Sequence, residues 1–162
     1  MEVQPAPDFT LEHIEGHSVS LRDFRGRPTV IAFSGRDNAE EMAQGITELR
    51  RHYDHDQLPI LAVADMGGIP RPARAIARHQ LKKGYNDAVQ TASAELQAAG
   101  KPVPPGPQLV IMLPDWSGEV ASSFGVTDVA QQSAMVLVDA EGQVRGYGRG
   151  AQSAQQVLAL FV

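Results

Sequence analysis

The sequence predicts an α/β protein in which a mixed central β-sheet is flanked by helices. Two observations carry this prediction. Continuous apolar runs at 29–33, 58–64 and 109–113 alternate with helical patterns, which is typical of buried parallel strands joined by crossover helices. Near the C-terminus, two further strand patterns are separated only by the turn Glu141-Gly142, so we expect them to pair as an antiparallel hairpin.

The composition predicts a single globular domain over residues 1–162. The chain is 43% hydrophobic and 20% charged, and at this length it buries a sizeable core without disulfides. Its net charge of −5 argues against general nucleic-acid binding, which usually leaves a basic footprint. No apolar run reaches the ~20 residues that cross a bilayer. The opening MEVQPAPDFT has no basic start and no apolar stretch, so we expect a cytoplasmic protein, although a chain trimmed of a leader would look the same.

The N-terminal half is expected to form a hairpin, a strand and a helix in that order. The hairpin lies between residues 5 and 21, with its turn at Glu15-Gly16. The strand at 29–33 leads through a loop at 34–38 into an amphipathic helix. The apolar stripe of that helix consists of Met42, Ile46, Leu49 and Tyr53.

The second half begins with the strand at 58–64 and a long helical segment at 72–99, in which Gly84 is a point for a bend or a break. The Pro-rich stretch 101–107 is expected to be an extended connector rather than a helix. The predicted apolar seam of the long helix is Ile76, Gln80 or Leu81, Tyr85, Val89, Ala92 and Leu96. The remaining expected elements are a strand at 109–113, a short helix at 120–126, strands at 135–138 and 144–147, and a closing helix at 153–161.

Several stretches of the sequence match the sequence patterns of one known family. They are PAPDFTLEHIEGHSVSLRDFRGRPTVIAF at 5–33, MVLVDAEGQVRGYGRG at 135–150, and ILAVADMGG and VASSFGV between them. In these stretches the chain resembles the redoxin, or thiol-specific antioxidant (AhpC/TSA), branch of the thioredoxin-like superfamily, which holds the peroxiredoxins and the membrane-tethered thiol reductases. The resemblance implies a thioredoxin-like fold and antioxidant oxidoreductase activity. Residues 70–107 match weakly and look like a helical insert.

The chain departs from this family where the chemistry takes place, because it contains no cysteine. Counted from Phe33, Asn38 stands where the attacking cysteine would be and Glu41 where the resolving cysteine would be. Ser133 occupies the place of the reductases' cis-proline or the peroxiredoxins' arginine. No other side chain supplies a thiolate at neutral pH, so the thiol mechanism is excluded. These changes predict a redox-inactive pseudoenzyme that has kept the fold.

The loop after the first buried strand is one candidate binding site, because ligands of open α/β sheets tend to lie at the carboxyl ends of strands. A competing interpretation is helix capping, since Asp37-x-x-Glu40 and Asn38-x-x-Glu41 both approximate a capping box. The two interpretations are compatible. The acidic residues disfavour a phosphate or thiolate ligand at this helix start. The candidate binding residues of the loop are Ser34, Arg36, Asp37 and Asn38.

A second candidate site is a row of cations on the long helix, which we call the basic stripe: Arg71, Arg74, Arg78 and Lys82. Its spacings of three, four and four residues place it on one helical face, and no acidic residue occurs between Asp65 and Asp87. The stripe is either a solvated helix face or a contact for an anionic surface, such as a protein, a second copy or lipid head groups. The apolar seam allows a helix-in-groove or dimer contact instead.

The remaining polar residues give weaker signals. The segment 52–56 contains two histidines and two aspartates, but it lies at an exposed helix end, and we predict neither a metal nor a cofactor. His13 and His17 flank the hairpin turn and are expected on the surface. Trp116, the single tryptophan, falls in a turn after a strand and is expected to be half-buried for structural reasons rather than to stack on a ligand.

These observations favour a cysteine-free, redox-inactive protein-binding or scaffold module, which recognises a protein partner through the loop or the insert. Self-association is a related possibility, and no membrane span is expected. Two alternatives remain. One is the antioxidant oxidoreductase implied by the resemblance, and the other is a non-thiol enzyme that uses Asp37, Glu40 and Glu41.

Overall fold

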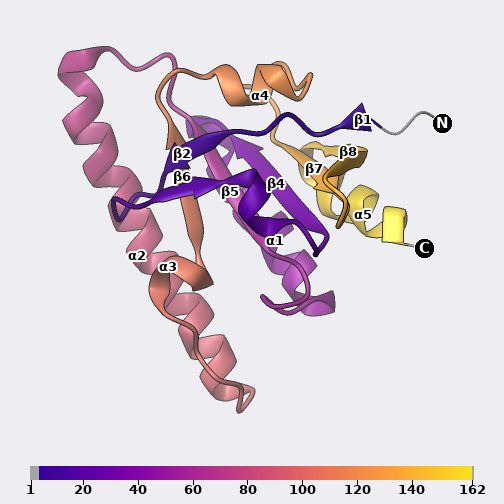
Figure 1. Ribbon diagram of the computed structural model, residues 1–162. Coiled ribbons are helices and arrows are strands. Elements are labelled where there is room, and N and C mark those ends of the chain that lie inside the picture. The colour runs from indigo at the N-terminus through magenta and orange to yellow at the C-terminus, as the bar shows by residue number, and fades with distance from the viewer. Residues whose placement is uncertain (1–3, 162) are drawn as a thin grey trace.

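The computed structural model describes residues 4–161, which contain a six-stranded sheet in the order β1-β8-β7-β4-β5-β6 (Figure 1). Strands β4, β5 and β6 are parallel, while β7 runs antiparallel to both β4 and β8, so the predicted mixed sheet is confirmed. The strands are β1 (Gln4–Pro5), β4 (Thr29–Ser34), β5 (Ile60–Asp65), β6 (Ile111–Asp115), β7 (Ala134–Val138) and β8 (Gln143–Arg149).

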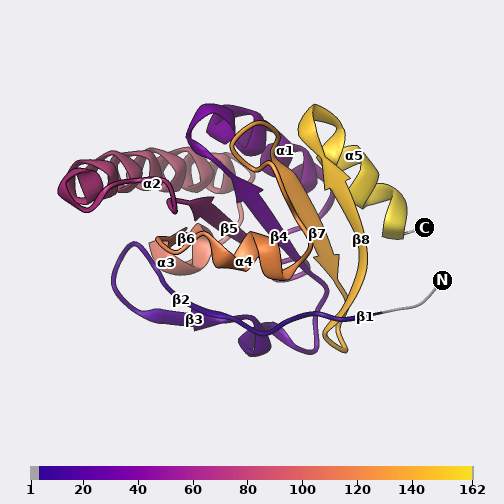
Figure 2. The ribbon, with the colours of Figure 1, turned by 90° about the horizontal axis from the view of Figure 1, so that it is seen from above.

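The central strand β4 separates two hydrophobic cores. Successive side chains of a strand point to opposite faces, so Val30 and Ala32 join one core while Ile31 and Phe33 join the other. Helices α1 and α5 cover the first face, and α4 with the hairpin β2–β3 covers the second (Figure 2). The helices are α1 (Ala39–His52), α2 (Arg74–Ala98), α3 (Gly106–Leu109), α4 (Glu119–Ser123) and α5 (Ser153–Leu158).

The N-terminal hairpin forms as predicted, from β2 (Thr10–Glu12) and β3 (Ser18–Ser20), but His13 is not on the surface. His13 is 0% exposed; its Nε2 donates to the carbonyl of Val110 at 3.0 Å, and its Nδ1 accepts from the Glu15 N–H at 3.0 Å. The backbone N–H of Ile14 also bonds to Met112, at 3.0 Å. The hairpin therefore lies along the outer edge of β6, and burial lowers the pKa of His13.

Helix α1 carries the predicted apolar stripe. Met42 and Leu49 are buried in the first core, and Ile46 and Tyr53 pack at its margin. At the end of the helix, Arg50 donates to the carbonyl of Leu58 at 2.7 Å, and its burial lowers the pKa of the guanidinium to about 10. The long side chain thus fastens the connection between α1 and β5.

Helix α2 is continuous, and it keeps most of the predicted apolar seam, with Tyr85 buried and Leu81, Val89, Ala92 and Leu96 half-buried, but not Ile76. It runs unbroken through Gly84, because one glycine in a long helix costs only about 1 kcal/mol relative to alanine. Tyr85 is its one buried residue, whereas Ile76 from the predicted seam is 65% exposed. The helix lies beside the β6 edge of the sheet rather than across a face, so only a narrow strip can be covered (Figures 1 and 2).

The Pro-rich connector ends earlier than predicted. Gly106 and Pro107 open the short helix α3, which proline tolerates because the first N–H groups of a helix have no partner inside it. Leu109 closes that helix, so β6 starts at Ile111 rather than at Leu109. The predicted closing helix is present as α5 and a following 3₁₀ turn at Ala159–Phe161.

Within residues 4–161, no helix combines the length and apolarity that crossing a bilayer requires. The first three residues of the N-terminal stretch used to argue for the absence of a leader lie outside the described residues.

Candidate functional site

The loop after β4 encloses Asn38, the residue at the expected nucleophile position. Asn38 is 8% exposed; its Oδ1 accepts from the Gly35 N–H at 2.8 Å, and its Nδ2 donates to the carbonyl of Val129 at 2.6 Å. Gly35 approaches the same segment so closely that a Cβ there would lie 3.0 Å from the Cα of Ala130. Asn38 therefore ties the end of β4 to the segment that precedes β7.

The capping box predicted for this helix start is wrong. Asn38 is the N-cap residue of α1, but no side-chain hydrogen bond caps the helix there. A 3₁₀ turn, Arg36–Asn38, comes first and places Asn38 at the third position of that turn. The Asn38 side chain therefore reaches back to Gly35 instead of forward to the first N–H groups of α1.

Glu41 and Ser133, the other two positions that the family comparison singled out, contact each other. The Ser133 hydroxyl donates to Glu41 Oε1 at 2.6 Å, and Ser133 is 0% exposed. A hydrogen bond to a carboxylate is stronger than one between neutral groups. The start of α1 is thus joined to the segment Val129–Ser133 at two points, by Asn38 and by Glu41.

The other loop residues face outward. Ser34 is half-buried, whereas Arg36, Asp37 and Glu40 are exposed. Within residues 4–161, the side chains of these three exposed residues make no hydrogen bond or ion pair in the structure, and neither cavity described below reaches them. The structure therefore places Asn38 in the interior and leaves Arg36 and Asp37 accessible.

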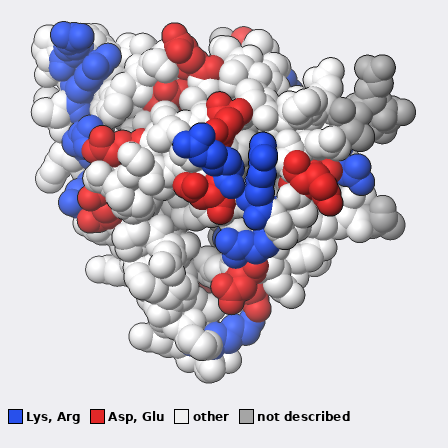
Figure 3. All heavy atoms as spheres, in the orientation of Figure 1, with Lys and Arg blue, Asp and Glu red and all other residues white. Residues whose placement is uncertain are grey.

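The basic stripe is brought together around Trp116. The guanidinium carbons of Arg74 and Arg78 lie 5.5 and 5.6 Å from the centre of the indole ring, within the range of cation–π attraction. Lys82 instead approaches Glu15 of the hairpin turn, at 3.9 Å. Arg71 is exposed in the 3₁₀ turn Arg71–Ala73 before α2. Figure 3 shows basic side chains gathered over the N-terminal end of α2.

Trp116 also borders the larger of the two cavities, which we call the Trp116 groove and which has a volume of ≈ 260 Å³. The groove lies between β2 of the hairpin and the end of β6 with the segment that follows it. Asp115 on its wall is 2% exposed, and its carboxylate is occupied by the Ser117 hydroxyl and the Val120 N–H. The lining residues are Thr10, Leu11, Glu12, Arg78, Pro114, Asp115, Trp116 and Ser117.

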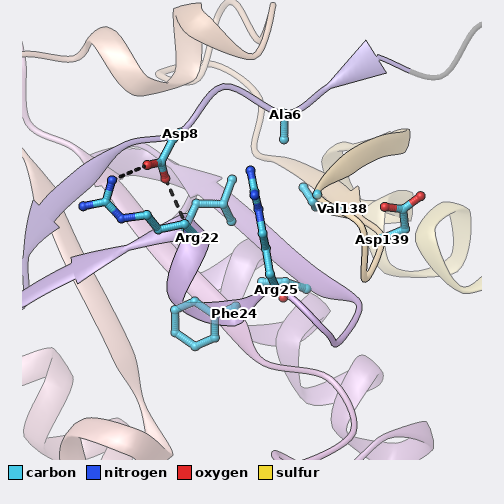
Figure 4. A pocket seen from close by; sticks show the side chains of 10 residues that line it. Ala6, Asp8, Arg22, Phe24, Arg25, Val138 and Asp139 are labelled. Atoms are coloured by element: carbon cyan, nitrogen blue, oxygen red, sulfur yellow. Dashed lines mark hydrogen bonds and ion pairs between the residues drawn. The ribbon is translucent and has the colours of Figure 1, made fainter.

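The smaller cavity lies under the N-terminal segment, between the 3₁₀ turn at Leu21–Phe24 and the β7–β8 turn (Figure 4). Asp8 pairs there with Arg22 at 3.3 Å. The side chain of Arg25 stands near Val138 and Asp139. Its volume of ≈ 20 Å³ accommodates a single water molecule, so it is not a ligand site.

The histidine segment after α1 is spread over separate contacts. His52 lies 3.7 Å from Glu48, and Asp54 pairs with Lys101 at 3.0 Å. Burial, together with the charge of Arg50, lowers the pKa of His55. Among the described residues 4–161, no three His, Asp or Glu side chains are grouped as metal ligands.

Sequence analysis missed two parts of this arrangement. It did not identify Gly35 and Val129 as the partners of Asn38, because both contacts depend on tertiary structure. It also did not place Glu12 and Ser117 beside the basic stripe. Trp116 was the available signal for the groove, but an amphipathic aromatic ring by itself does not distinguish a structural role from a ligand contact.

Solved structures with a thioredoxin-like fold resemble the chain over nearly its whole length. An exposed lipoprotein thioredoxin from Streptococcus pneumoniae has a TM-score of 0.63 and 18% identity, covering 94% of this chain and 98% of its own. MTB DsbF has a TM-score of 0.60 and 22% identity, with 94% of each chain covered. A thiol-disulfide oxidoreductase from Bacteroides fragilis has a TM-score of 0.60 and 17% identity, with 98% and 100% covered. At these identities the likeness establishes the fold alone.

The sequence comparison agrees with the structural one. Residues 3–82 match the AhpC/TSA family, a range that spans the hairpin, β4, α1, β5 and the start of α2. No curated protein matches the chain. The resemblance predicted from the sequence is confirmed, and the chain contains no cysteine. The chain therefore has a thioredoxin-like fold and no cysteine, and its residues 3–82 are similar to the AhpC/TSA family.

Proposed function

We propose that this chain is a redox-inactive module that binds a protein partner on a retained thioredoxin-like fold. One observation carries the proposal. Asn38 and Glu41, which replace the two thiols, are committed to hydrogen bonds with the segment Val129–Ser133. These bonds make the former reaction site part of the scaffold.

The physical reason is that thiol redox chemistry needs an accessible thiolate, and an amide cannot replace it. Asn38 is buried, and both ends of its amide have backbone partners. The antioxidant activity associated with the family therefore lacks a nucleophile in this chain. The thiol-disulfide oxidoreductase activity named for a structural relative belongs to that protein.

A non-thiol enzyme at Asp37, Glu40 and Glu41 has less support. The Glu41 carboxylate is turned toward Ser133, while Asp37 and Glu40 are exposed. A catalytic site usually holds its substrate in a cleft of several hundred Å³, and neither of the two cavities described above is lined by Asp37, Glu40 or Glu41. The accessible candidates for partner contact are the loop residues Arg36 and Asp37 and the basic stripe.

The redox part of the proposal is tested by peroxide consumption and by insulin reduction with dithiothreitol as the electron donor. We expect rates equal to those of the heat-denatured protein. Turnover above that control would overturn the proposal, because it would require a catalytic group that the proposal denies.

The binding part is tested by quantitative partner capture with the whole chain as bait, alongside light scattering for self-association. Two charge-reversed baits separate the surfaces: Arg74→Glu with Arg78→Glu for the stripe, and Arg36→Glu with Asp37→Arg for the loop. We expect a defined protein, or a second copy, to bind the unmodified chain and to be lost with one bait and kept with the other. Failure of every bait, with a strict monomer at all concentrations, contradicts the proposal.

A further inference from the structure

We propose that the Trp116 groove and the basic stripe bind an acidic peptide segment of a protein partner, with Arg74 and Arg78 pairing its carboxylates. This inference rests on the proposed function and names the partner's chemistry and its place of contact. It concerns the N-terminal end of α2, the segment after β6 and the strand β2.

The first step is the position of the two guanidinium groups. Their central carbons lie over the same indole ring, at 5.5 and 5.6 Å from its centre. An arginine attracted to the face of an aromatic ring can still donate N–H groups to a carboxylate. Trp116 therefore holds Arg74 and Arg78 in place before any ligand arrives, which lowers the entropic cost of binding.

The second step is that the arginines of the stripe have no carboxylate partner within the described part of the chain. Among residues 4–161, no carboxylate lies within ion-pair distance of Arg71, Arg74 or Arg78, whereas Lys82 is paired with Glu15. The Nε of Arg74 is buried without a hydrogen-bond partner. An incoming carboxylate cannot reach a buried Nε, so the exposed side chain of Arg78 is the one more open to a ligand.

The third step concerns the size of the ligand. Arg71 to Lys82 spans eleven residues of helix, or roughly 16 Å, which matches about five residues of an extended peptide. The groove volume of ≈ 260 Å³ is too small for a folded domain. The net charge of −5 repels a long polyanion such as a nucleic acid, but a short acidic segment meets only the local positive field.

The fourth step concerns the mode of binding. Pro114 lies in β6, the outermost strand of the sheet, and lacks the N–H that an added strand would use. Strand addition is therefore interrupted beside the groove, and recognition falls to side-chain carboxylates. Glu12 also lines the groove, from β2, and its negative charge repels an acidic ligand. This residue therefore weakens the attraction that the arginines provide.

The test is a titration of the whole chain with a fluorescein-labelled hexaglutamate peptide, followed by anisotropy and by the emission of Trp116, the single tryptophan. We expect saturable binding that weakens with added salt. Arg74→Glu with Arg78→Glu, and Arg78→Glu alone, should weaken the affinity by at least about tenfold. Lys83→Glu, an equal charge change on the same helix outside the stripe, should change it by less than about twofold. Glu12→Gln should strengthen binding.

Arg78→Glu alone keeps the test decisive if the double variant unfolds, because Arg78 is exposed. Hexalysine, inorganic phosphate and phosphatidylglycerol vesicles form the comparison arms. No saturable peptide binding, equal binding by Arg78→Glu, or tighter binding of phosphate or vesicles overturns the inference. If the chain still captures a partner and shows no redox turnover in that case, the proposed function stands and only the assignment of the groove is wrong.

Discussion

The loop after β4 and the groove beside Trp116 both gather polar side chains at a strand end, and they use them in opposite ways. At the loop, Asn38 and Glu41 turn inward, and each has a partner in the segment Val129–Ser133. At the groove, Arg74 and Arg78 have no carboxylate partner in the described chain and are held by an aromatic ring instead. The first arrangement stabilises the fold, and the second is open to a ligand.

This difference bears on where the proposed binding function lies. The loop was expected to occupy the family's reactive position, and its residues Asn38 and Glu41 already have partners within the fold. The groove lies beside the start of α2, and the family match to residues 3–82 includes this part of the segment that was expected to match weakly. We therefore expect substitutions at the loop to change stability and substitutions at the groove to change binding, and four predictions test that division.

The largest expected effect comes from Asn38→Ala. It leaves the Gly35 N–H and the Val129 carbonyl without partners inside the protein, so we expect a loss of about 3 kcal/mol in the free energy of unfolding. Urea denaturation of the variant and the unmodified chain measures the loss. Asp37→Ala, at the exposed neighbour, is the control and should change stability by less than about 0.5 kcal/mol. A loss below about 1 kcal/mol for Asn38→Ala would show that the hydrogen bonds of Asn38 do not stabilise the fold as proposed.

Next in size is the coupling between Glu41 and Ser133. A double-mutant cycle with Glu41→Ala and Ser133→Ala should give a coupling energy of about 1.5 kcal/mol, because the hydroxyl donates to a charged, half-buried carboxylate. The four proteins are compared by chemical denaturation at pH 7. Additive effects of the two substitutions would show that the 2.6 Å contact does not contribute to stability.

The third prediction concerns the change of the unfolding free energy with pH. We expect this change to come from His13 in the hairpin. Burial lowers the pKa of His13 below its usual 6.5, so the unfolded chain takes up a proton first as the pH falls. The free energy of unfolding should decrease below pH 6.5 by at most about 1.4 kcal/mol per pH unit from this residue, and level off once the folded His13 is also protonated. His55 contributes in the same direction.

His13→Gln separates this contribution from that of His55. Glutamine keeps an amide donor for the Val110 carbonyl but does not titrate, so unfolding free energies between pH 7 and pH 5 should fall less steeply in the variant. His17 stacks on His13, with ring centres 4.6 Å apart, and Glu15 and Tyr85 also face it. Equal slopes for the two proteins would show that His13 is not the group that responds.

The smallest expected change in stability comes from Arg78→Ala. The side chain is exposed and its contact with Trp116 is a surface contact, so the free energy of unfolding should change by less than about 0.5 kcal/mol. Urea denaturation followed by far-UV circular dichroism gives the value. A loss above about 1 kcal/mol would show that Arg78 stabilises the fold. The groove would then not differ from the loop in its effect on stability.

Much of the fold could be predicted because its signals are local. The strands at 29–33 and 58–64 are continuous apolar runs, and the stripe of α1 repeats at helical spacing. Counting from Phe33 sufficed to identify Asn38 and Glu41 as the positions of interest. What each residue does there was not predictable, because Asn38 reaches Val129 across 91 positions of sequence.

The errors on α2 and at His13 have a common physical cause. On α2 the predicted seam is correct at Tyr85 and wrong at Ile76, because neighbouring segments cover the helix at Tyr85 and leave Ile76 65% exposed. His13 is buried because the hairpin lies along the same edge, 97 residues from its acceptor Val110. A pattern along one segment does not reveal which neighbouring segment will cover it.

The two hydrogen bonds of the Asn38 amide have a consequence for engineering. A cysteine at that position would leave a buried N–H and a buried carbonyl without partners at once, since a thiol is shorter and a poor hydrogen-bonding group. Installing a thiol there therefore requires simultaneous changes at distant positions, around Gly35 and Val129, and a single substitution at residue 38 would weaken the scaffold that has to hold the new group.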